Sequence, residues 1–400
     1  MELRNFINGQ FIDSISKKNI DVINPSNQEL VGKINQGLDG EIDLAYQAAR
    51  KAFQKRILID MDPKKKSKIM RAVASKLREY KHEGGKLLSK ENGKTIAQCE
   101  GEFLGAADTF DYYAGMTDKI ENKLIPSGSD TFNYVVLEPF GVTLQIVPWN
   151  YPVSIFASMV AQNLIVGNTI VIKPPELCPI SSNLYGRIFQ EVGLPDGVVN
   201  IIHGHGEITG RKLVQNRECD YIVFTGSPEV ASEILKETAD RIIPCHFELG
   251  GKSAAIIYPD ADIDKAVDST IKGIFKPNAG QICVAMSRVI VHPKVKDEYM
   301  TKLVSKTKEL KIGAGDNSST DVTPLISKEQ IKRVSNYVKS GIQSGATLTL
   351  GGEEFEIGKG NYYLPTIFDN VDKESTIAQE EIFGPVTSIF DFEDNEQAIE

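Results

Sequence analysis

Short apolar runs alternate with helical patterns from Gly141 onward, and this alternation constrains the fold most strongly. The runs are "GVTLQIV", "TIVIKP", "VVNII", "YIVF" and "AAIIY", and most are rich in β-branched residues. Strands that are buried on both faces of a parallel sheet have such near-continuous apolar sequences, and strands that alternate with helices form βαβ units. The pattern predicts an α/β fold with a doubly wound, Rossmann-like parallel sheet.

The chain is long enough for more than one domain. Its 400 residues exceed the roughly 250 to 300 at which a single core stops growing, and a second strand–helix alternation begins near Val289. We expect one α/β domain from 1–119 and 139–247 and a second from 248–400. Residues 120–138 carry two strand-like runs around a Pro-Ser-Gly-Ser-Asp turn, which predicts a projecting β-hairpin.

Local signals fix some element ends. Asn8-Gly9 in "FINGQFID" is a strong hairpin signal, and Asp62-Pro63 is typical of a helix start. The three lysines that follow Pro63 are expected in the solvated first turn of that helix. The final residues, "DFEDNEQAIE", begin a further helix capped by Asp394 or Asn395.

Composition excludes several classes of partner. The net charge of −9, with acidic and basic residues interspersed, does not favour binding to nucleic acid or to an anionic membrane. The start, "MELRNFINGQ", lacks a secretory signal pattern, so a cytoplasmic location is expected. The apolar stretch Tyr151–Val166 is too short for a membrane span of ~20 residues and predicts a buried helix. The five scattered cysteines contain no C-x-x-C pair, which indicates reduced thiols and no metal site.

Cys283 lies in "NAGQICVAMSR", behind a small polar lead-in and before a short apolar run. A lone free cysteine is most often a buried filler. However, Asn278, Gly280 and Gln281 suit a loop whose backbone N–H groups can face a ligand. A reactive thiolate needs such a donor-rich, partly exposed setting, so Cys283 is a candidate nucleophile, with the buried role left open.

Two further stretches carry candidate catalytic side chains. Glu248 stands between Phe247 and Leu249 and before two glycines in "FELGGKS". Burial there would raise its pKa, as a general base requires, although a surface glutamate at a strand end fits the segment equally well. Asn150 in "VPWNYP" follows a predicted strand at the sheet edge where ligands bind. Its amide is able to stabilise an oxyanion, but an ordinary turn asparagine is the simpler interpretation of that stretch alone.

Two more stretches are typical of cofactor binding. In "TIVIKPPE", Lys173 and Glu176 follow a strand, where an acidic residue accepts a ribose 2′-OH and repels a 2′-phosphate. In "FTGSPEV", a strand leads into a helix with Ser227 as N-cap, and free N–H groups at such a start attract phosphate. By contrast, "GHGEITG" has the wrong spacing for G-x-G-x-x-G and predicts a turn.

Together these stretches resemble the NAD(P)-dependent aldehyde dehydrogenase superfamily. The motifs "PWNYP", "KPPE", "FTGSPEV", "FELGGKS", "NAGQIC" and "EEIFGPV" occur in the family's order and approximate spacing. The resemblance spans essentially the whole chain. Since members of the family continue beyond the point that matches Glu400, we expect the sequence to be incomplete at its C-terminus.

The resemblance implies oxidation of an aldehyde to the carboxylic acid, with NAD as hydride acceptor and NADP disfavoured. Cys283 matches the nucleophile that forms a thiohemiacetal and then a thioester. Asn150 matches the side chain that stabilises the oxyanion, and Glu248 matches the base that activates water. Cofactor contacts are implied for Lys173, Glu176, Gly226, Ser227, Glu381 and Phe383, and an aldehyde channel for Tyr151, Ser158, Met116 and Ile282.

The resemblance also assigns roles to the segments. It implies that residues 1–119 and 139–247 form a dinucleotide-binding domain and that residues 248–400 form the catalytic domain. The hairpin at 120–138 becomes a bridging element in a homodimer or homotetramer.

Three alternatives remain open, and one is disfavoured. A CoA-acylating relative would use the same cysteine without a water-activating glutamate, so Glu248 favours the acid as product. A semialdehyde-specific relative is compatible with the same motifs, and the sequence does not identify the aldehyde. A catalytically silent structural homologue would share the fold, which alone decides no function. A cysteine hydrolase is disfavoured because no His or Trp follows Cys283 in the pattern of papain-like enzymes.

Overall fold

The computed structural model describes residues 2–13, 15 and 17–399. They form two compact units. The first unit contains the residues up to Val22, Val31–Leu87 and Glu100–Glu248. The second unit contains Ile23–Leu30, Leu88–Cys99 and the residues from Leu249 onward.

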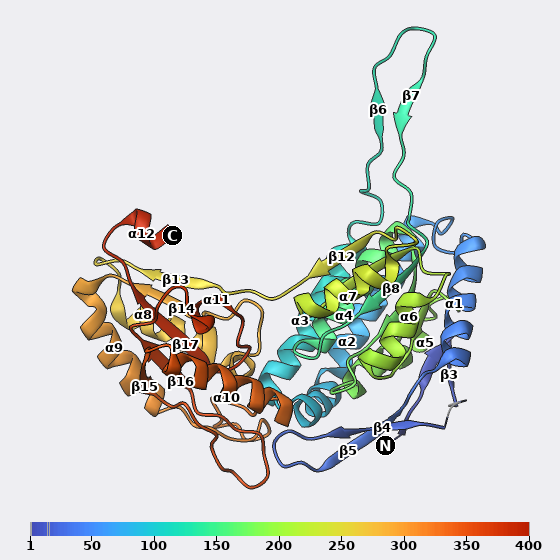
Figure 1. Ribbon diagram of the computed structural model, residues 1–400. Coiled ribbons are helices and arrows are strands. Elements are labelled where there is room, and N and C mark those ends of the chain that lie inside the picture. Colours follow the sequence, from blue (N-terminus) through green and yellow to red (C-terminus); the bar gives the residue numbers. More distant parts are fainter. Residues whose placement is uncertain (1, 14, 16, 400) are drawn as a thin grey trace. The chain divides into compact units, whose positions relative to one another are not determined.

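The central sheet of the first unit has the order β12-β11-β8-β9-β10-β2-β3 (Figure 1). Its parallel strands are β8 (Val142–Ile146), β9 (Thr169–Lys173), β10 (Val199–Ile201), β11 (Tyr221–Thr225) and β12 (Cys245–Glu248). The antiparallel edge is β2 (Asn5–Ile7) and β3 (Gln10–Ile12). Asn8 and Gly9 join these two strands with φ of 50° and 79°, as the hairpin prediction requires. A smaller sheet has the order β1-β5-β4, with β1 (Glu2–Leu3), β4 (Asn19–Ile23) and β5 (Leu30–Asn35).

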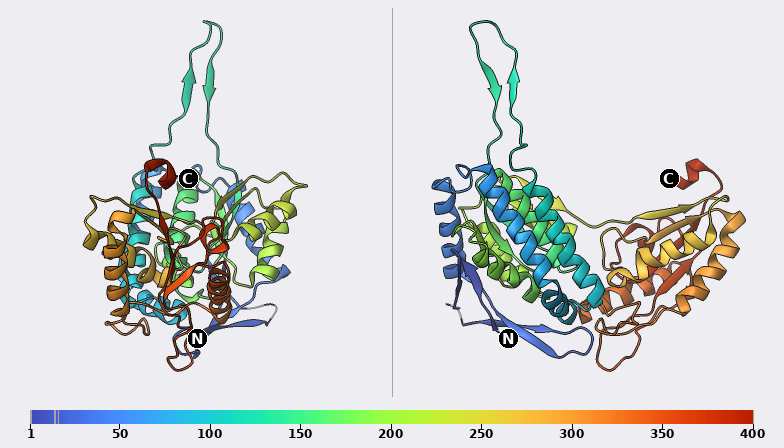
Figure 2. Two further views of the ribbon diagram at one scale, coloured as in Figure 1. Left: turned by 60° about the vertical axis from the view of Figure 1, so that its left-hand side comes forward. Right: turned by 180° about the vertical axis from the view of Figure 1, so that it is seen from behind.

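Helices cover both faces of the central sheet, which confirms the doubly wound α/β fold (Figures 1 and 2). On one face lie α1 (Asp39–Gln54), α6 (Arg211–Gln215) and α7 (Pro228–Thr238). On the other lie α4 (Pro152–Val166) and α5 (Ile180–Glu191), with α2 (Pro63–Asn92) and α3 (Ile96–Ala114) packed outside them. A short π-helical turn, η1 (Gly206–Gly210), precedes α6.

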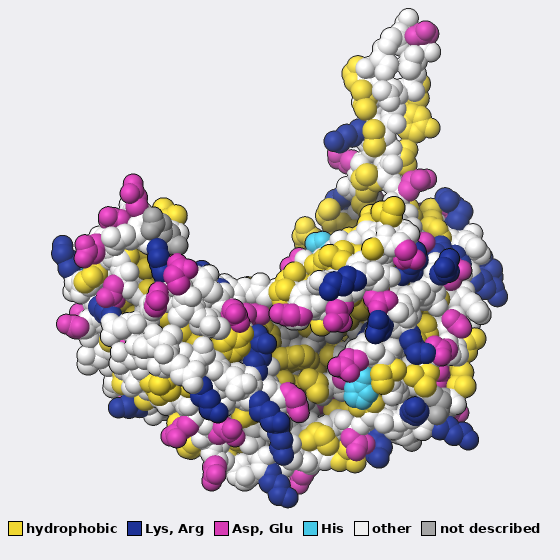
Figure 3. Space-filling view, viewed as in Figure 1, with side chains coloured by type: hydrophobic (Ala, Val, Ile, Leu, Met, Phe, Trp, Pro, Cys, Tyr) yellow, Lys and Arg dark blue, Asp and Glu magenta, His cyan; other side chains and the backbone are white. Residues whose placement is uncertain are grey.

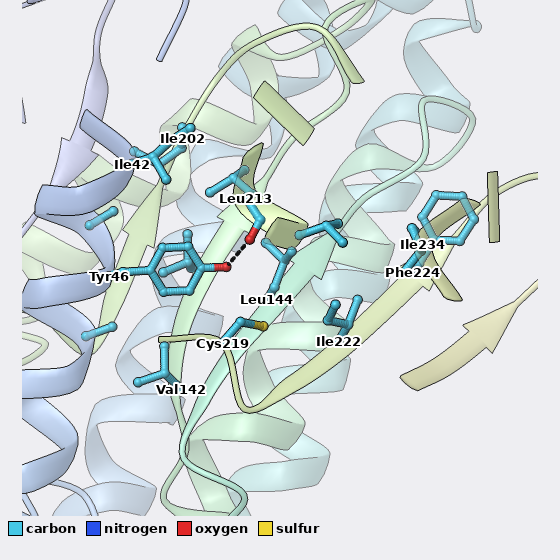
Figure 4. Close-up of a cluster of buried hydrophobic side chains, with 14 of the residues drawn as sticks. Ile42, Tyr46, Val142, Leu144, Ile202, Leu213, Cys219, Ile222, Phe224 and Ile234 are labelled. Carbon is cyan, nitrogen blue, oxygen red and sulfur yellow. Dashed lines mark hydrogen bonds between the residues drawn. The ribbon is translucent and has the colours of Figure 1, made fainter. Parts of the chain in front are cut away.

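The core under α1 is apolar apart from one satisfied hydroxyl (Figure 4). Ile42 and Tyr46 of α1 belong to one buried cluster with Leu144 of β8 and Ile222 of β11. The Tyr46 hydroxyl donates to the Leu213 carbonyl oxygen at 2.8 Å. Burial raises the pKa of Tyr46 well above its ordinary value, so this core stays uncharged.

The predicted hairpin is present as β6 (Lys123–Ile125) and β7 (Asn133–Val135), which pair antiparallel with Leu124 opposite Tyr134. It extends away from the rest of the first unit (Figure 2). Its exposed apolar side chains, several of which are visible in Figure 3, are Leu124, Ile125, Phe132, Tyr134, Val135, Val136 and Leu137. Such a surface is unusual on an isolated domain.

The second unit contains a five-stranded sheet of order β13-β14-β17-β16-β15. The strands are β13 (Ala254–Ile257), β14 (Arg288–Val291), β15 (Thr347–Leu350), β16 (Thr366–Asp369) and β17 (Val386–Asp391), parallel except for β15. The helices are α8 (Ile263–Thr270), η2 (Ile271–Phe275), η3 (Pro277–Gly280), α9 (Pro293–Lys308), α10 (Lys328–Gln343), α11 (Thr376–Gln379) and α12 (Asn395–Ile399). None of the helices in the described residues is long and apolar enough to cross a membrane.

The expected division of the chain differs from these units at two early segments. Residues 23–30 and 88–99 group with the second unit rather than the first. The Asn361 N–H donates to the Pro25 carbonyl at 2.9 Å, and the Ile96 N–H donates to the Gly315 carbonyl at 3.0 Å. Backbone bonds to residues distant in sequence therefore hold both segments, and the sequence carries no local signal for such bonds.

Candidate active site

The predicted site residues of the first unit follow the carboxyl ends of neighbouring strands. Asn150 follows β8, Lys173 ends β9, Gly226 follows β11 and Glu248 ends β12. These four strands are adjacent in the order β12-β11-β8-β9 and run parallel. The residues therefore share the sheet edge at which open α/β sheets bind ligands.

Asn150 is held in a rigid strand-to-helix connection. It is 5% exposed. The preceding Val147 N–H donates to the Lys173 carbonyl at 3.0 Å. After it, the first turn of α4 is fixed by the Glu102 carboxylate, which accepts from the Val153 N–H at 2.8 Å. Hydrogen bonds on both flanks therefore restrain the backbone at Asn150.

Lys173 and Glu176 form an ion pair in which the lysine is buried and the glutamate half-buried. Lys173 is 2% exposed, and its Nζ donates to Glu176 Oε2 at 2.9 Å. Glu176 Oε1 accepts from the Gly206 N–H at 3.1 Å. Burial opposes ionisation of Glu176, but the charge of Lys173 and hydrogen bonds to its carboxylate outweigh burial and lower its pKa to about 2. The carboxylate is therefore ionised at neutral pH.

The contribution of Gly206 to this pair was not predicted from the sequence. The stretch "GHGEITG" forms η1, not a turn, and η1 places the Gly206 N–H against Glu176. Gly204 has a φ of 153°, and a Cβ there would lie 1.9 Å from Thr209 Oγ1. The glycine that begins this stretch is thus required by close packing, which a motif search for phosphate loops does not detect.

The start of α7 matches its prediction. Ser227 is the N-cap, and its Oγ accepts from the Val230 N–H at 3.4 Å, with Pro228 at the first helical position. The Gly226 N–H donates to the Glu248 carbonyl at 3.0 Å. The ends of β11 and β12 are therefore joined directly beside the start of the helix.

The sequence left two interpretations of Glu248 open, a buried carboxylate and a surface glutamate at a strand end, and the structure has the second. The Glu248 side chain is 67% exposed, and its Oε1 lies 3.1 Å from His246 Nε2. The reason is the alternation of β12, an edge strand. Cys245 and Phe247 face the core, while His246 and Glu248 point to the other side. Glu248 is therefore an accessible carboxylate next to an imidazole, not a desolvated one.

Cys283 in the second unit is exposed and lies on the loop after η3. The preceding Asn278, Ala279 and Gly280 have φ of 48°, 50° and 75°, a rare run of left-handed residues. A Cβ on Gly280 would lie 2.2 Å from the Gly384 carbonyl oxygen. Close packing against the backbone of residue 384 therefore fixes the loop that carries the thiol.

The polar lead-in to Cys283 is buried, in contrast to the expected ligand-facing loop. Asn278 and Gln281 are each 0% exposed. Gln281 Nε2 donates to the Asn278 carbonyl at 2.9 Å, and Gln281 Oε1 accepts from the Ile326 N–H at 3.0 Å. These side chains support the loop from within and leave Cys283 on the outside.

Residues of three motifs that are distant in sequence contact one another in the second unit: the glycines of "FELGGKS", Cys283 of "NAGQIC" and Glu381 of "EEIFGPV". A Cβ on Gly251 would lie 2.6 Å from the Cys283 carbonyl oxygen. The Gly251 N–H donates to Glu381 Oε1 at 3.2 Å, and a Cβ on Gly250 would lie 2.3 Å from Glu381 Oε2. The glycine pair of "FELGGKS" thus lies against both the cysteine loop and Glu381, and at Gly251, which faces backbone, a larger residue requires a shift of that backbone.

The expected aldehyde-channel residues divide between the units. Met116, Tyr151 and Ser158 belong to the first unit and are half-buried. Ile282 belongs to the second unit and is 7% exposed. Among residues 2–13, 15 and 17–399, no group of three or more His, Cys, Asp or Glu side chains is placed to hold a metal ion.

Comparison with known proteins identifies the family. The model of the aldehyde dehydrogenase family matches residues 11–400. Betaine aldehyde dehydrogenase of Bacillus subtilis is 37% identical over 360 residues, which cover 89% of this chain and 73% of the relative. Aldehyde dehydrogenase family 2 member B4, a mitochondrial protein of Arabidopsis thaliana, is 39% identical over 398 residues, which cover 98% of this chain and 73% of the relative.

Solved structures agree with the sequence relatives. The NAD+ complex of aldehyde dehydrogenase from Bacillus cereus is 36% identical with a TM-score of 0.97, and the match covers 100% of this chain and 81% of that one. Betaine aldehyde dehydrogenase from Staphylococcus aureus, in complex with NAD+, is 34% identical with a TM-score of 0.96, and the match covers 99% and 79%. The chain belongs to the aldehyde dehydrogenase family, whose members are oxidoreductases that act on the aldehyde group.

Proposed function

We propose that the chain oxidises an aldehyde to the carboxylic acid with NAD as hydride acceptor and Cys283 as nucleophile. The observation that carries the proposal is the loop of Cys283. An exposed thiol is held by a buried Asn278–Gln281 pair and by the backbone of Gly251. A related betaine aldehyde dehydrogenase from Staphylococcus aureus has been solved with NAD+ and a BME-modified cysteine, which supports a reactive thiol in the family.

The carboxyl edge of the first sheet suits NAD. The Lys173–Glu176 pair offers a half-buried, ionised carboxylate there, which accepts a ribose hydroxyl and repels the 2′-phosphate of NADP. The N–H groups at the start of α7, near Gly226 and Ser227, suit a pyrophosphate. Glu381 and Phe383 are the proposed contacts of the second unit to the nicotinamide ribose. NAD, when bound, supplies the acceptor for the hydride.

The chemistry of the chain's own residues follows from this assignment. The Cys283 thiolate attacks the aldehyde carbon, a C–S bond forms, and the carbonyl electron pair moves onto oxygen to give the thiohemiacetal. The Asn150 amide and the Cys283 backbone N–H donate to that oxygen. Loss of hydride leaves a thioester on Cys283. Glu248 takes a proton from water as the water attacks the thioester, and the C–S bond breaks to release the acid and the thiolate. The exposure of Glu248 gives water access to its carboxylate.

The remaining roles are proposals of the same account. The first unit binds the dinucleotide, and the second carries the nucleophile. Tyr151, Ser158, Met116 and Ile282 line the path of the aldehyde. The exposed apolar hairpin of residues 120–138 contacts another subunit in a homodimer or homotetramer. The cytoplasmic location stays a prediction from the sequence, since relatives from Arabidopsis thaliana and Leishmania tarentolae are named mitochondrial.

The test is NADH formation by the purified protein across a panel of aldehydes, with NAD and NADP in parallel. Wild type should form NADH, with a higher kcat/KM for NAD than for NADP, and Cys283→Ala should form none. Product analysis with and without CoA separates a carboxylic acid from an acyl-CoA. The proposal fails if folded wild type forms no NADH with any aldehyde, or if Cys283→Ala retains activity.

A further inference from the structure

The segment Glu380–Phe383 has an unusual set of backbone hydrogen bonds. Lys252 Nζ donates to the Glu380 carbonyl at 2.6 Å, and Arg333 Nη2 donates to the Glu381 carbonyl at 2.7 Å. Arg333 Nε donates to the Ile382 carbonyl at 3.4 Å, and Gln330 Nε2 donates to the Phe383 carbonyl at 2.7 Å. Each consecutive carbonyl of the segment therefore accepts from a side chain.

The segment needs these donors because no sheet holds it. It lies between the end of α11 at Gln379 and the start of β17 at Val386. Phe383 has a φ of 62°, a left-handed conformation that is strained for a non-glycine residue. Such a conformation persists only where the surroundings hold it, and the donor to its own carbonyl is Gln330.

The donors on α10 are themselves ordered. The Gln330 N–H bonds to Ser327 Oγ at 3.2 Å in the first turn of the helix. The Arg333 guanidinium lies 5.1 Å from the centre of the Tyr337 ring. The Tyr337 hydroxyl donates to Glu380 Oε2 at 2.8 Å. One face of α10 thus presents a prearranged set of donors to the segment.

Lys252 approaches the segment from the other side, directly after the glycine pair. Burial and the nearby Arg288 guanidinium lower the pKa of Lys252 to about 8, against the opposing charges of Glu381 and Glu380. Lys252 is half-buried, and its Nζ, 2.6 Å from the Glu380 carbonyl oxygen, makes a direct charge-assisted hydrogen bond to the segment.

The segment also packs against the loop of the nucleophile. Gly384, directly after the segment, lies against Gly280 of the cysteine loop: a Cβ on Gly280 would be only 2.2 Å from the Gly384 carbonyl oxygen. Gly251, which donates to Glu381, lies against the Cys283 carbonyl. A shift of the segment would therefore be transmitted to the cysteine loop, because packed backbones cannot interpenetrate.

We infer that Lys252, Gln330 and Arg333 form a donor clamp that fixes the backbone of Glu380–Phe383 and so positions Glu381 and Phe383 for the cofactor. The clamp residues are positioning residues, since they act through the segment. The inference rests on the proposed function for the roles of Glu381 and Phe383. The conformation of the segment is independent of that function and can be measured without ligand.

The test compares Gln330→Leu/Arg333→Met with Lys332→Met in the full chain. Lys332 is an exposed neighbour on the same helix, so its variant controls for surface change. Hydrogen exchange of peptides covering 380–384 is measured without NAD, and the Kd of NAD is measured by calorimetry. In the double variant, we expect at least tenfold faster exchange in the segment and at least a tenfold higher Kd, with Lys332→Met within twofold of wild type. Arg333→Lys, which keeps a charged donor, should recover part of both changes.

The readouts separate the possible failures. If the folded double variant has wild-type exchange in this segment, the clamp is refuted whatever its activity, because a residue that merely touched NAD would leave the ligand-free exchange unchanged. The single variants Gln330→Leu and Arg333→Met serve the same comparison if the double variant does not fold. If wild type binds no NAD, the proposed function fails while the exchange comparison still decides the clamp.

Discussion

Gly251 and Cys283 are in direct backbone contact, since a Cβ on Gly251 would lie 2.6 Å from the Cys283 carbonyl oxygen. Gly251, which lies close in sequence to the proposed base Glu248, is therefore a structural neighbour of the proposed nucleophile Cys283. The contact explains why the motif "FELGGKS" needs a glycine at this position, and it makes the cysteine loop sensitive to a single methyl group.

Gly251→Ala is predicted to displace the loop of Cys283. The added Cβ cannot be accommodated without a backbone shift, which in packed regions costs about 1–3 kcal/mol. We expect that loss in the free energy of unfolding and at least a tenfold fall in kcat, measured by urea denaturation and by NADH formation. Gly101→Ala on α3 is the matched control, because nothing lies within 4 Å of its Cβ position. Equal effects of the two substitutions would contradict the prediction.

The Lys173–Glu176 pair is predicted to make the free energy of unfolding depend on pH. The pKa of Glu176 is lowered from 4.5 to about 2 in the folded chain. A carboxylate with a depressed folded pKa contributes stability above its unfolded pKa, and the contribution is lost as the pH falls from about 4.5 towards 2. Glu176→Gln should therefore cost about 3 kcal/mol at pH 7, with a smaller difference from wild type at pH 3. Urea denaturation of wild type and Glu176→Gln at pH 7 and pH 3 measures this difference in the free energy of unfolding. A difference that is the same at both pH values would contradict the stabilising role of the ionised Glu176.

The hairpin surface is predicted to control assembly. Leu124 and Tyr134 face each other across the β6–β7 pair, and their side chains are 65% and 59% exposed. A charge on this apolar surface should oppose its burial against another subunit. Leu124→Asp/Tyr134→Asp should therefore reduce the molar mass measured by light scattering to that of a smaller assembly. Ser129→Asp, at the turn of the same hairpin, is the control, and an unchanged mass in the double variant would contradict the proposed role.

The sequence predicted much of the fold because its signals are local. The Asn8-Gly9 turn, the Ser227 cap and the apolar strands of the central sheet each depend on a few adjacent residues, and the structure confirms them. The sequence left a buried and an exposed Cys283 open, and the structure has the exposed one.

Tertiary contacts account for what the sequence did not predict. The sequence did not decide between burial and exposure of Glu248, and its exposure follows from the position of β12 at the sheet edge. Lys66, expected in a solvated turn, is buried, and its Nζ donates to the Ile165 carbonyl at 3.1 Å. The Gly206 N–H and the donors to Glu380–Phe383 come from residues distant in sequence. No composition or spacing rule addresses such contacts.

The most direct test of the central claim is to trap the acyl-enzyme. Glu248→Gln is mixed with NAD and an aldehyde that wild type oxidises, quenched in acid, digested and analysed by mass spectrometry. We predict one NADH per active site in a rapid burst and the acyl mass on the peptide that contains Cys283. A burst with the acyl mass on another cysteine, or turnover at the wild-type rate without any adduct, would contradict the account.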